Sequence, residues 1–386
     1  MKRNKNIGIV TSSRADFYLL EKIIFNLKRK SNLKLLITGT HHSKKYGYSY
    51  RYISKIKKCK KINIKIDTDQ TTKKKIILNA GKIFKNCSKI FDKEKLDILI
   101  VLGDRFELLP FASSAVIFNV PIVHIHGGEI THGSTDDQVR HSISKLSNYH
   151  FTSNNEYKKR LIQMGEKKEN IFNYGSLGIE NALKIKFLSR KVLEKKFKIK
   201  FIKKNVLVNY HPETAVKRNI AKDFEKVMYS CKKFNNVNFI FTYPNFDNKS
   251  NSIINILTKY SRLYKNFFVI KNFGQKAFFS IVRNVDFVMG NSSSGIIEVP
   301  ALKKPTINIG TRQSGRVKTK SIFDCKTEKK SIISMMKYLF VKKHVNKIKY
   351  NTFRNLNTSK KICSKILGLN INKTFPKKFI DVNKDL

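Results

Sequence analysis

Short apolar runs alternate with amphipathic helical patterns along the first half of this chain. The apolar runs are bounded by polar or turn residues and predict strands at residues 7–11, 34–38, 98–102, 122–126 and 150–152. A 3.6-residue period predicts helices at residues 16–29, 72–91, 107–118, 136–146 and 155–164. This βαβ alternation predicts a parallel, doubly wound sheet, whose ligands bind beyond the carboxyl ends of the strands.

The pattern restarts in the second half, after a charged helical stretch at residues 180–197. Strands are predicted at residues 205–209, 238–242, 267–270, 286–289 and 306–309, and residues 326–367 are helical and basic. We therefore predict an α/β protein with two Rossmann-like domains that face each other across a cleft, the GT-B-like arrangement of nucleotide-sugar enzymes. The expected division is residues 1–180, residues 181–365, and a tail of residues 366–386 that can return to the first domain.

Composition agrees with a globular enzyme and predicts where it works. Hydrophobic residues make up 41% of the 386 residues, and no apolar run reaches the roughly 20 residues that a membrane span needs. The first residues lead directly into a strand and carry no signal-peptide pattern, so we expect a cytoplasmic protein without membrane contact. The five cysteines are scattered without CxxC pairs, which fits a reducing compartment and disfavours a zinc site.

The formal net charge of +52 raises the alternative of a nucleic-acid-binding protein. The excess is nearly all lysine, spread over the whole length and accompanied by abundant Ile, Asn, Phe and Tyr, the residue set that an AT-rich genome favours. No motif of a nucleic-acid-binding module accompanies it. We therefore expect no specific nucleic-acid partner. The alternative predicts salt-sensitive RNA binding that survives loss of Asp104.

The segment DFVMGNSSSGIIE, residues 286–298, reads as a strand, a turn and the start of a helix. Free backbone N–H groups at a helix start bind a phosphate well, and Ser292 and Ser293 add hydroxyl donors. Glu298 falls about one turn into the helix, where it can accept from a ribose hydroxyl. The alternative is that these serines only cap the helix.

Further polar clusters follow the predicted strands of the first half. Arg14, after the first strand, can clamp a phosphate. Asp104 ends an apolar strand, and its neighbour Arg105 is expected to lower the pKa of the Asp104 carboxyl. In HIHGGE, strand alternation puts His124 and His126 on one face, and the two glycines permit a turn that exposes Glu129. Asp136 opens the next helix.

The second half repeats this placement. His211 follows the strand at residues 205–209, Asn245 follows the strand at 238–242, and Arg312 follows the strand at 306–309. Carboxylates beside histidines suit removal and return of a proton, since different environments separate the pKa values of similar groups. Metal-ligand spacings are absent, so we expect neither a metal nor a cofactor. Seven polar clusters directly after strands together predict one interdomain active site.

With these residues in view, the chain resembles the hydrolysing branch of the UDP-N-acetylglucosamine 2-epimerases. The resemblance runs from about residue 7 to residue 316 and is carried by five segments: RADFYLL, GDRFELLPFA, HIHGGEITHGSTDDQVRHSISKLS, GNSSSGIIEVPAL and PTINIGTRQSGR. It implies that UDP-N-acetylglucosamine and water yield N-acetylmannosamine and UDP through a 2-acetamidoglucal, for sialic acid biosynthesis. It also implies a UDP-sugar as partner and a homo-oligomer, a dimer or a tetramer.

The resemblance assigns roles by position. The first domain would carry the sugar and the catalysis and the second would bind UDP. Asp104 and Asp136 match catalytic acids, and the positions that hold UDP are matched by Arg14, Arg105, His211, Asn245, Ser292, Ser293, Glu298 and Arg312. His211 also counts as a catalytic candidate.

One departure leaves the base and the acid open. His126 stands where some members have a catalytic glutamate, so either Glu129 takes over that duty or His126 joins the proton transfer. The main alternative in function is the same chemistry on a UDP-2,4-diacetamido-trideoxyhexose, leading to legionaminic acid. A further alternative is a GT-B glycosyltransferase, which would release UDP only when an acceptor is present.

Overall fold

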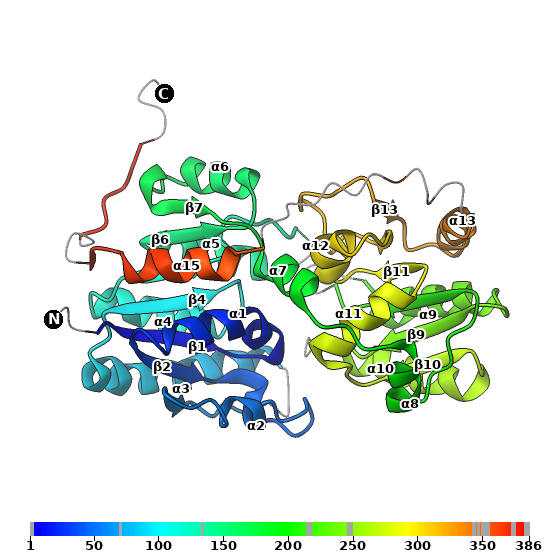
Figure 1. The fold of residues 1–386 in the computed structure, drawn as a ribbon, viewed down its shortest axis with the longest axis horizontal. Coiled ribbons are helices and arrows are strands. Elements are labelled where there is room, and N and C mark those ends of the chain that lie inside the picture. The colour runs from blue at the N-terminus through cyan, green and yellow to red at the C-terminus, as the bar shows by residue number, and fades with distance from the viewer. Residues whose placement is uncertain are drawn as a thin grey trace. The chain divides into compact units, whose positions relative to one another are not determined.

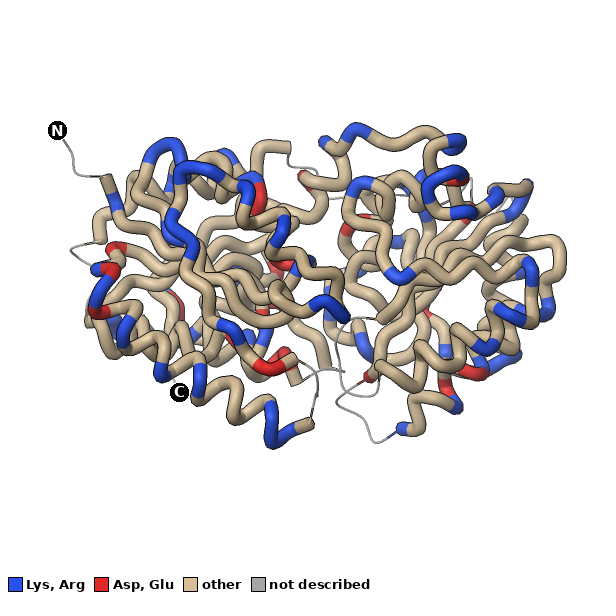
Figure 2. Tube along the Cα trace, turned by 90° about the horizontal axis from the view of Figure 1, so that it is seen from below, with Lys and Arg blue, Asp and Glu red and all other residues tan. Residues whose placement is uncertain are grey.

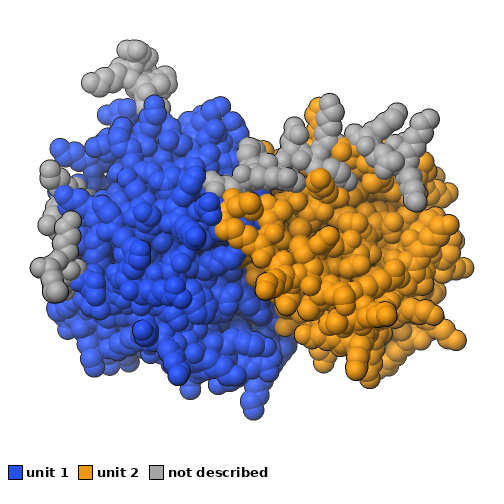
Figure 3. Space-filling view, in the orientation of Figure 1, with its two compact units in different colours: residues 1–129, 136–180, 357–386 blue, residues 130–135, 181–356 orange. Residues whose placement is uncertain are grey.

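The computed structural model describes residues 4–68, 72–132, 135–213, 218–244, 250–341, 345, 348, 356–371 and 376–381. The chain forms two compact units (Figure 3). Unit 1 comprises residues 1–129, 136–180 and 357–386, and unit 2 comprises residues 130–135 and 181–356. The chain therefore crosses between the units at four points.

Unit 1 is built on a seven-stranded parallel sheet with the order β3-β2-β1-β4-β5-β6-β7 (Figure 1). The strands are β1 (Asn6–Thr11), β2 (Asn32–Ile37), β3 (Lys60–Asn63), β4 (Ile98–Leu102), β5 (Ile122–Ile125), β6 (Tyr149–Thr152) and β7 (Ile171–Asn173). The helices are α1 (Arg14–Leu27), α2 (Tyr50–Ile53), α3 (Lys73–Glu94), α4 (Leu108–Ile117), α5 (Asp136–Leu146), α6 (Asn155–Gln163) and α15 (Thr358–Leu367), with short 3-10 helices η1 (Gly39–His42) and η2 (Lys168–Asn170). Helix α7 (Leu177–Lys184) spans the boundary between the units.

Both faces of this sheet are buried, which explains why its central strands are apolar throughout. Along β4, Ile98 and Ile100 pack into the apolar cluster covered by α1 and α15, whereas Leu99 and Val101 pack into the cluster covered by α3 and α4. Successive side chains of a strand point to opposite faces, so a strand covered on both sides needs a continuous apolar run. All five residues of β4 are buried.

Unit 2 repeats the plan with six parallel strands in the order β10-β9-β8-β11-β12-β13. The strands are β8 (Asn205–Asn209), β9 (Asn238–Thr242), β10 (Phe267–Ile270), β11 (Phe287–Gly290), β12 (Thr306–Ile309) and β13 (Ile322–Cys325). The helices are α8 (Arg190–Phe197), α9 (Ile220–Lys232), α10 (Ser250–Leu263), α11 (Gly274–Asn284), α12 (Ser293–Ala301) and α13 (Lys329–Leu339). The predicted fold class of two Rossmann-like α/β domains is confirmed.

Three strands of the structure were not predicted from the sequence: β3, β7 and β13. Each lies at an edge of its sheet. They are short and carry polar or charged residues, as in KKIN and IFDC. An edge strand has one unpaired side and needs less apolar surface, so its sequence lacks the continuous apolar run of a central strand.

Helix α15 belongs to unit 1, whereas the sequence-based division assigned residues 181–365 to the second domain. Ile362 and Ile366 enter the same apolar cluster as residues of α1. The ammonium group of Lys5 donates to the carbonyl oxygens of Leu367 at 2.8 Å and Leu369 at 2.7 Å, where the helix ends. A cation at the end of a helix satisfies carbonyl groups that lack a partner within the helix. Helix α15 therefore packs beside α1 against the sheet of unit 1.

Lysine and arginine are spread over both units (Figure 2). Within the described residues, no helix combines the length and the apolar character that a membrane crossing requires.

Candidate active site

The residues singled out in the sequence lie at the carboxyl ends of the parallel strands in both units. In unit 1, Arg14 follows β1, Asp104 follows β4, and His126 follows β5. In unit 2, His211 follows β8, Ser292 follows β11, and Arg312 follows β12. Asn245 lies outside the described residues.

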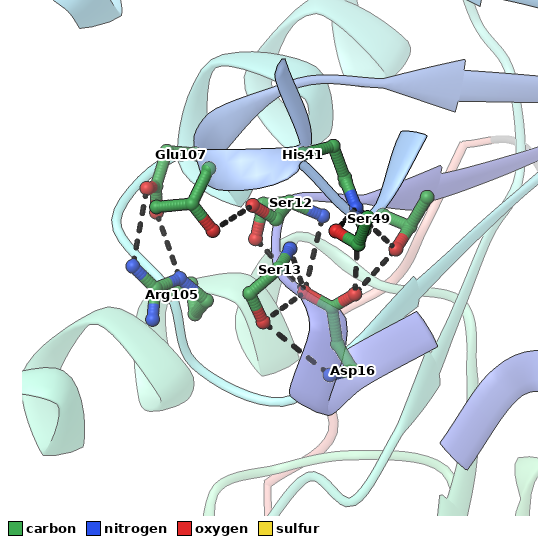
Figure 4. Close-up of polar contacts among 9 residues, drawn as sticks. Ser12, Ser13, Asp16, His41, Ser49, Arg105 and Glu107 are labelled. Carbon is green, nitrogen blue, oxygen red and sulfur yellow. Dashed lines mark hydrogen bonds and ion pairs between the residues drawn. The ribbon is translucent and has the colours of Figure 1, made fainter. Parts of the chain in front are cut away.

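The loop after β1 is held by one carboxylate, that of Asp16 (Figure 4). Asp16 accepts from the backbone N–H groups of Ser12 at 3.0 Å and Ser13 at 2.9 Å, and also from both serine hydroxyls. Ser13 in turn caps α1, so the two residues form a capping box. Arg14 is half-buried, and within the described part of the chain it forms neither a hydrogen bond nor an ion pair. The loop held by Asp16 therefore presents the Arg14 guanidinium, which is available to bind an anion.

The carboxylate of Asp104 pairs with the guanidinium of Arg140, from α5. Arg105 donates to Glu107 from Nε and Nη2, both at 3.3 Å, and its expected effect on Asp104 stays a prediction. Arg140 is 1% exposed and also donates to Asp137 at 3.1 Å and to the carbonyl oxygen of Glu129 at 2.8 Å. A buried guanidinium needs paired negative charge, and its pairing with Asp104 orients that carboxylate.

His124 holds Gly103, the residue before Asp104. Its Nε2 lies 2.8 Å from the carbonyl oxygen of Gly103, and its Nδ1 lies 3.0 Å from the hydroxyl of Ser144. A carbonyl can only accept, so Nε2 carries the proton and Nδ1 accepts from Ser144. Burial lowers the pKa of His124 to about 3, and the ring is neutral at physiological pH. His124 therefore connects Gly103, next to Asp104, with Ser144 of α5.

The prediction that His124 and His126 share one face is wrong. Strand β5 ends at Ile125, and His126 has a positive φ of 65°, which breaks the strand alternation. The turned backbone brings His126 Nδ1 to 3.7 Å from the Glu129 carboxylate. Glu129 is 3% exposed and accepts from the Ser153 hydroxyl at 3.3 Å. His126 and Glu129 thus form a buried pair that can share a proton.

Asp136 is the first residue of α5 and is half-buried. The following Asp137 pairs with Arg140 and lies 3.8 Å from His141. Carboxylates in the first turn of a helix lie at the positive end of its dipole, which favours their ionised form.

In unit 2, the side chain of Asn291 organises the strand ends. It accepts from the His211 N–H at 2.7 Å and donates to the His211 carbonyl oxygen at 2.9 Å. The main-chain carbonyl oxygen of Asn291 accepts from the side chains of Arg312 at 3.2 Å and Gln313 at 3.0 Å. Asn291 therefore ties the loops after β8, β11 and β12 together. Burial, with a contribution from the charge of Arg312, holds the pKa of His211 well below its usual value.

Helix α12 begins at Ser293, and Ser292 is its N-cap residue. The Ser292 side chain makes no capping bond and instead shares a hydrogen bond of 3.0 Å with the Ser294 hydroxyl. The alternative that Ser292 only caps the helix is therefore not the arrangement observed. The helix start keeps its donors available, and Glu298 lies half-buried in its second turn. Such a helix start binds phosphate groups.

Two residues that the sequence analysis did not assign a role position this loop system: Asn291 and Glu213. The Glu213 carboxylate accepts from the Thr311 N–H at 3.0 Å, the Thr311 hydroxyl at 3.1 Å and the Arg312 N–H at 3.3 Å. A side chain on Gly310, which has a φ of 79°, would meet Glu213 at 2.3 Å. The signal in the sequence was weak, since one acidic residue after HP has many possible roles.

The described residues contain no group of three or more His, Cys, Asp or Glu side chains that could hold a metal ion. The cysteines Cys59, Cys87, Cys231, Cys325 and Cys363 are unpaired thiols.

Solved structures share this fold. The structure of a UDP-N-acetylglucosamine 2-epimerase from Neisseria meningitidis bound to UDP-N-acetylglucosamine superposes with a TM-score of 0.78 over 94% of this chain and 100% of that one, at 17% identity. At that identity the likeness defines the class of fold, two parallel-sheet Rossmann-like domains.

Sequence comparison identifies the family. The chain belongs to the UDP-N-acetylglucosamine 2-epimerase family, whose profile matches residues 26–367. It is 36% identical to a hydrolysing GDP/UDP-N,N'-diacetylbacillosamine 2-epimerase of Campylobacter jejuni, over 83% of this chain and 84% of the relative. It is also 36% identical to a polysialic acid biosynthesis protein of Escherichia coli, over 85% of this chain and 84% of that protein.

The buried histidines predict how stability depends on pH. Burial lowers the pKa of His41 to about 4 and that of His124 to about 3, against about 6.5 in an unfolded chain. The unfolded state binds more protons between these values, so the free energy of unfolding should fall as pH falls from 6.5 towards 4. We expect a loss of about 2 kcal/mol per histidine between pH 6.5 and 5, measured by urea unfolding.

The His124→Gln variant should lose part of this pH dependence, because one buried titrating group is removed. The His132→Gln variant changes an exposed histidine and should keep the wild-type dependence. Equal pH dependence in all three proteins would contradict the assignment.

Proposed function

We propose that this protein is a hydrolysing 2-epimerase of a UDP-linked 2-acetamido sugar. The proposed reaction converts UDP-N-acetylglucosamine and water into N-acetylmannosamine and UDP, as a step in sialic acid biosynthesis. The observation that carries the proposal is the Asp104 carboxylate at the end of β4, paired with buried Arg140 and accompanied by the His126–Glu129 pair. Family membership supports the same reading.

The chemistry needs a base, a leaving group and a proton returned to the opposite face. The base removes the C2 proton, the C1–O bond to UDP breaks with its electron pair on UDP, and a 2-acetamidoglucal remains. Water then adds its hydroxyl to C1 while a proton returns to C2 from the other side. Asp104 suits the base, because its carboxylate follows β4 and is held in place by Arg140.

For the returning proton we propose a donor among Glu129, His126 and Asp136. His126 and Glu129 lie 3.7 Å apart and are both buried, so an imidazole and a carboxylate lie together, and both types of group can serve as a general acid. His211 is neutral in its buried position and is proposed as a hydrogen-bonding partner of the substrate, with a catalytic role also open to it.

For UDP we propose Ser292, Ser293, Glu298, Arg312 and His211 of unit 2, together with Asn245. The start of α12 supplies N–H donors for the diphosphate, and Glu298 can accept from the ribose. Arg14 and Arg105 of unit 1 are proposed as further phosphate ligands. Among the described residues the Arg14 guanidinium forms neither a hydrogen bond nor an ion pair, which supports its part in this set.

The relatives favour one specific alternative substrate. Relatives from Campylobacter jejuni and Legionella pneumophila, 36% and 31% identical, are diacetylbacillosamine 2-epimerases. A UDP-2,4-diacetamido-trideoxyhexose would undergo the same C2 chemistry, because the extra acetamido group lies on C4, away from the reacting bonds. We further propose a cytoplasmic enzyme, since free cysteines fit a reducing compartment.

An NMR experiment in D₂O tests the function and the substrate together. Purified protein with UDP-N-acetylglucosamine should yield UDP and N-acetylmannosamine that carries deuterium at C2, because the returned proton comes from solvent. A parallel reaction with the UDP-diacetamido sugar compares the two substrates. Turnover of the diacetamido sugar alone would select the alternative. UDP release that requires an added sugar acceptor would indicate a glycosyltransferase instead.

The Asp104→Asn variant tests the catalytic base. The amide cannot take the proton, so turnover should fall by a factor of about 1,000 or more while UDP affinity stays within about threefold of wild type. Turnover is followed by UDP release and affinity by isothermal titration calorimetry. The Asp137→Asn variant changes the other carboxylate that pairs with Arg140 and should retain far more activity. Comparable losses in both variants would mean that Asp104 only balances the charge of Arg140.

We also propose a homo-oligomer, a dimer or a tetramer. In unit 1, α3 and α4 expose Ile77 (63% exposed), Phe84 (43%) and Ile117 (74%). An apolar patch is complementary to itself in a twofold contact, so these helices are where two copies can meet.

The Ile117→Asp variant should shift the protein towards monomer in analytical ultracentrifugation, because it would bury a charge at the contact. The Val192→Asp variant changes an exposed apolar residue of α8 and should leave the assembly unchanged. A wild-type monomer would refute the proposal.

A further inference from the structure

We propose that a buried hydrogen-bond chain, Ser49–His41–Thr11–Asp16, holds the Arg14 loop in the conformation that binds a diphosphate. The Arg14 loop is residues 12–14, between β1 and the first turn of α1. His41 and Thr11 are then positioning residues. This inference rests on the proposed function, in which Arg14 binds UDP.

The four side chains form one continuous chain of contacts. Asp16, His41 and Ser49 are labelled in Figure 4. The Thr11 hydroxyl bonds the Asp16 carboxylate and lies 2.9 Å from Nε2 of His41. Nδ1 of His41 lies 2.8 Å from the Ser49 hydroxyl. Thr11 and His41 are completely buried, and Ser49 is 2% exposed.

One arrangement of protons agrees with all of these contacts. The Asp16 carboxylate accepts from two backbone N–H groups and from the hydroxyl of Thr11. Thr11 has a single proton, which it gives to Asp16, and its oxygen must accept from Nε2–H of His41. Burial lowers the pKa of His41 to about 4, so the ring carries one proton and its Nδ1 accepts from Ser49. The chain is therefore directional and ends on Asp16.

Asp16 is the residue that holds the Arg14 loop, and a second contact holds the same loop from η1, which follows β2. The N–H of Thr40 donates to the Ser12 carbonyl oxygen at 2.8 Å. Gly39 has a φ of 64°, and a side chain there would meet that oxygen at 2.0 Å. The backbone on the amino side of Arg14 is thus fixed by Asp16 and by the segment that carries His41.

The cation at the end of this loop is prepared for an anion. Burial lowers the pKa of Arg14 below its ordinary value, since its guanidinium is partly removed from water. Holding such a group in place beforehand reduces the entropy lost on binding. The hydrogen-bond chain supplies that preorganisation, because it determines where the loop and Arg14 lie.

The rival explanation is that His41 only completes the core. The two explanations separate in a matched pair of variants, Thr11→Val and Thr38→Val. Both threonines are fully buried at the ends of neighbouring strands, and the Thr38 hydroxyl has no hydrogen-bond partner among the described residues. Each substitution removes one hydroxyl and keeps the shape of the side chain.

We expect the Kd for UDP, measured by calorimetry on folded protein, to rise roughly tenfold in Thr11→Val and to stay within twofold in Thr38→Val. Thr11→Ser restores the hydroxyl and should recover affinity to within about threefold of wild type. In turnover assays the loss should appear mainly in KM, since Arg14 is proposed to bind the substrate and not to react.

Equal UDP affinity in the two valine variants would overturn the positioning role, as would failure of Thr11→Ser to recover. If Thr11→Val does not fold, Ser49→Ala is the deciding variant, because it removes the far end of the chain. It should weaken UDP binding about threefold, and wild-type affinity would refute the inference. A wild-type protein that binds no UDP would instead refute the proposed function.

Discussion

Every strand of both sheets runs parallel to its neighbours, and this constraint controls where the polar side chains of the protein lie. Parallel strands need helices on both faces, so the strands themselves are apolar and cannot carry the chemistry. All of their carboxyl ends meet at one edge of each sheet. The polar residues of the candidate site lie just past that edge, outside the apolar strands: Asp104, His126, His211 and Ser292.

Within unit 1, the buried charge of Arg140 has the widest consequences. A guanidinium that is 1% exposed is tolerated only with paired acceptors, and its acceptors are Asp104, Asp137 and the carbonyl oxygen of Glu129. One structural requirement, neutralising Arg140, thereby brings the ends of β4 and β5 and the start of α5 together. Neutral His124 of β5 also donates to the carbonyl oxygen of Gly103, at the end of β4.

In unit 2, the loops after the strands are joined by a neutral residue, Asn291. Its side-chain amide donates to and accepts from the main chain of His211, and its main-chain carbonyl oxygen accepts from Arg312. This suits a region proposed to bind a diphosphate, where an additional carboxylate would repel the ligand. The Glu213 carboxylate is occupied by three donors of the loop after β12.

The sequence by itself determined the class of fold, the central strands and the strand-end positions of the candidate site, because hydrophobic periodicity is a local property of the chain. It did not reveal the edge strands β3, β7 and β13, whose short polar sequences depend on a neighbouring strand. Only the tertiary structure decided the observed partners: Arg140 for Asp104, and Glu129 for His126. It also decided that α15 returns to unit 1. Such pairings join residues far apart in the chain, and their energies come from burial and distance, which no local pattern encodes.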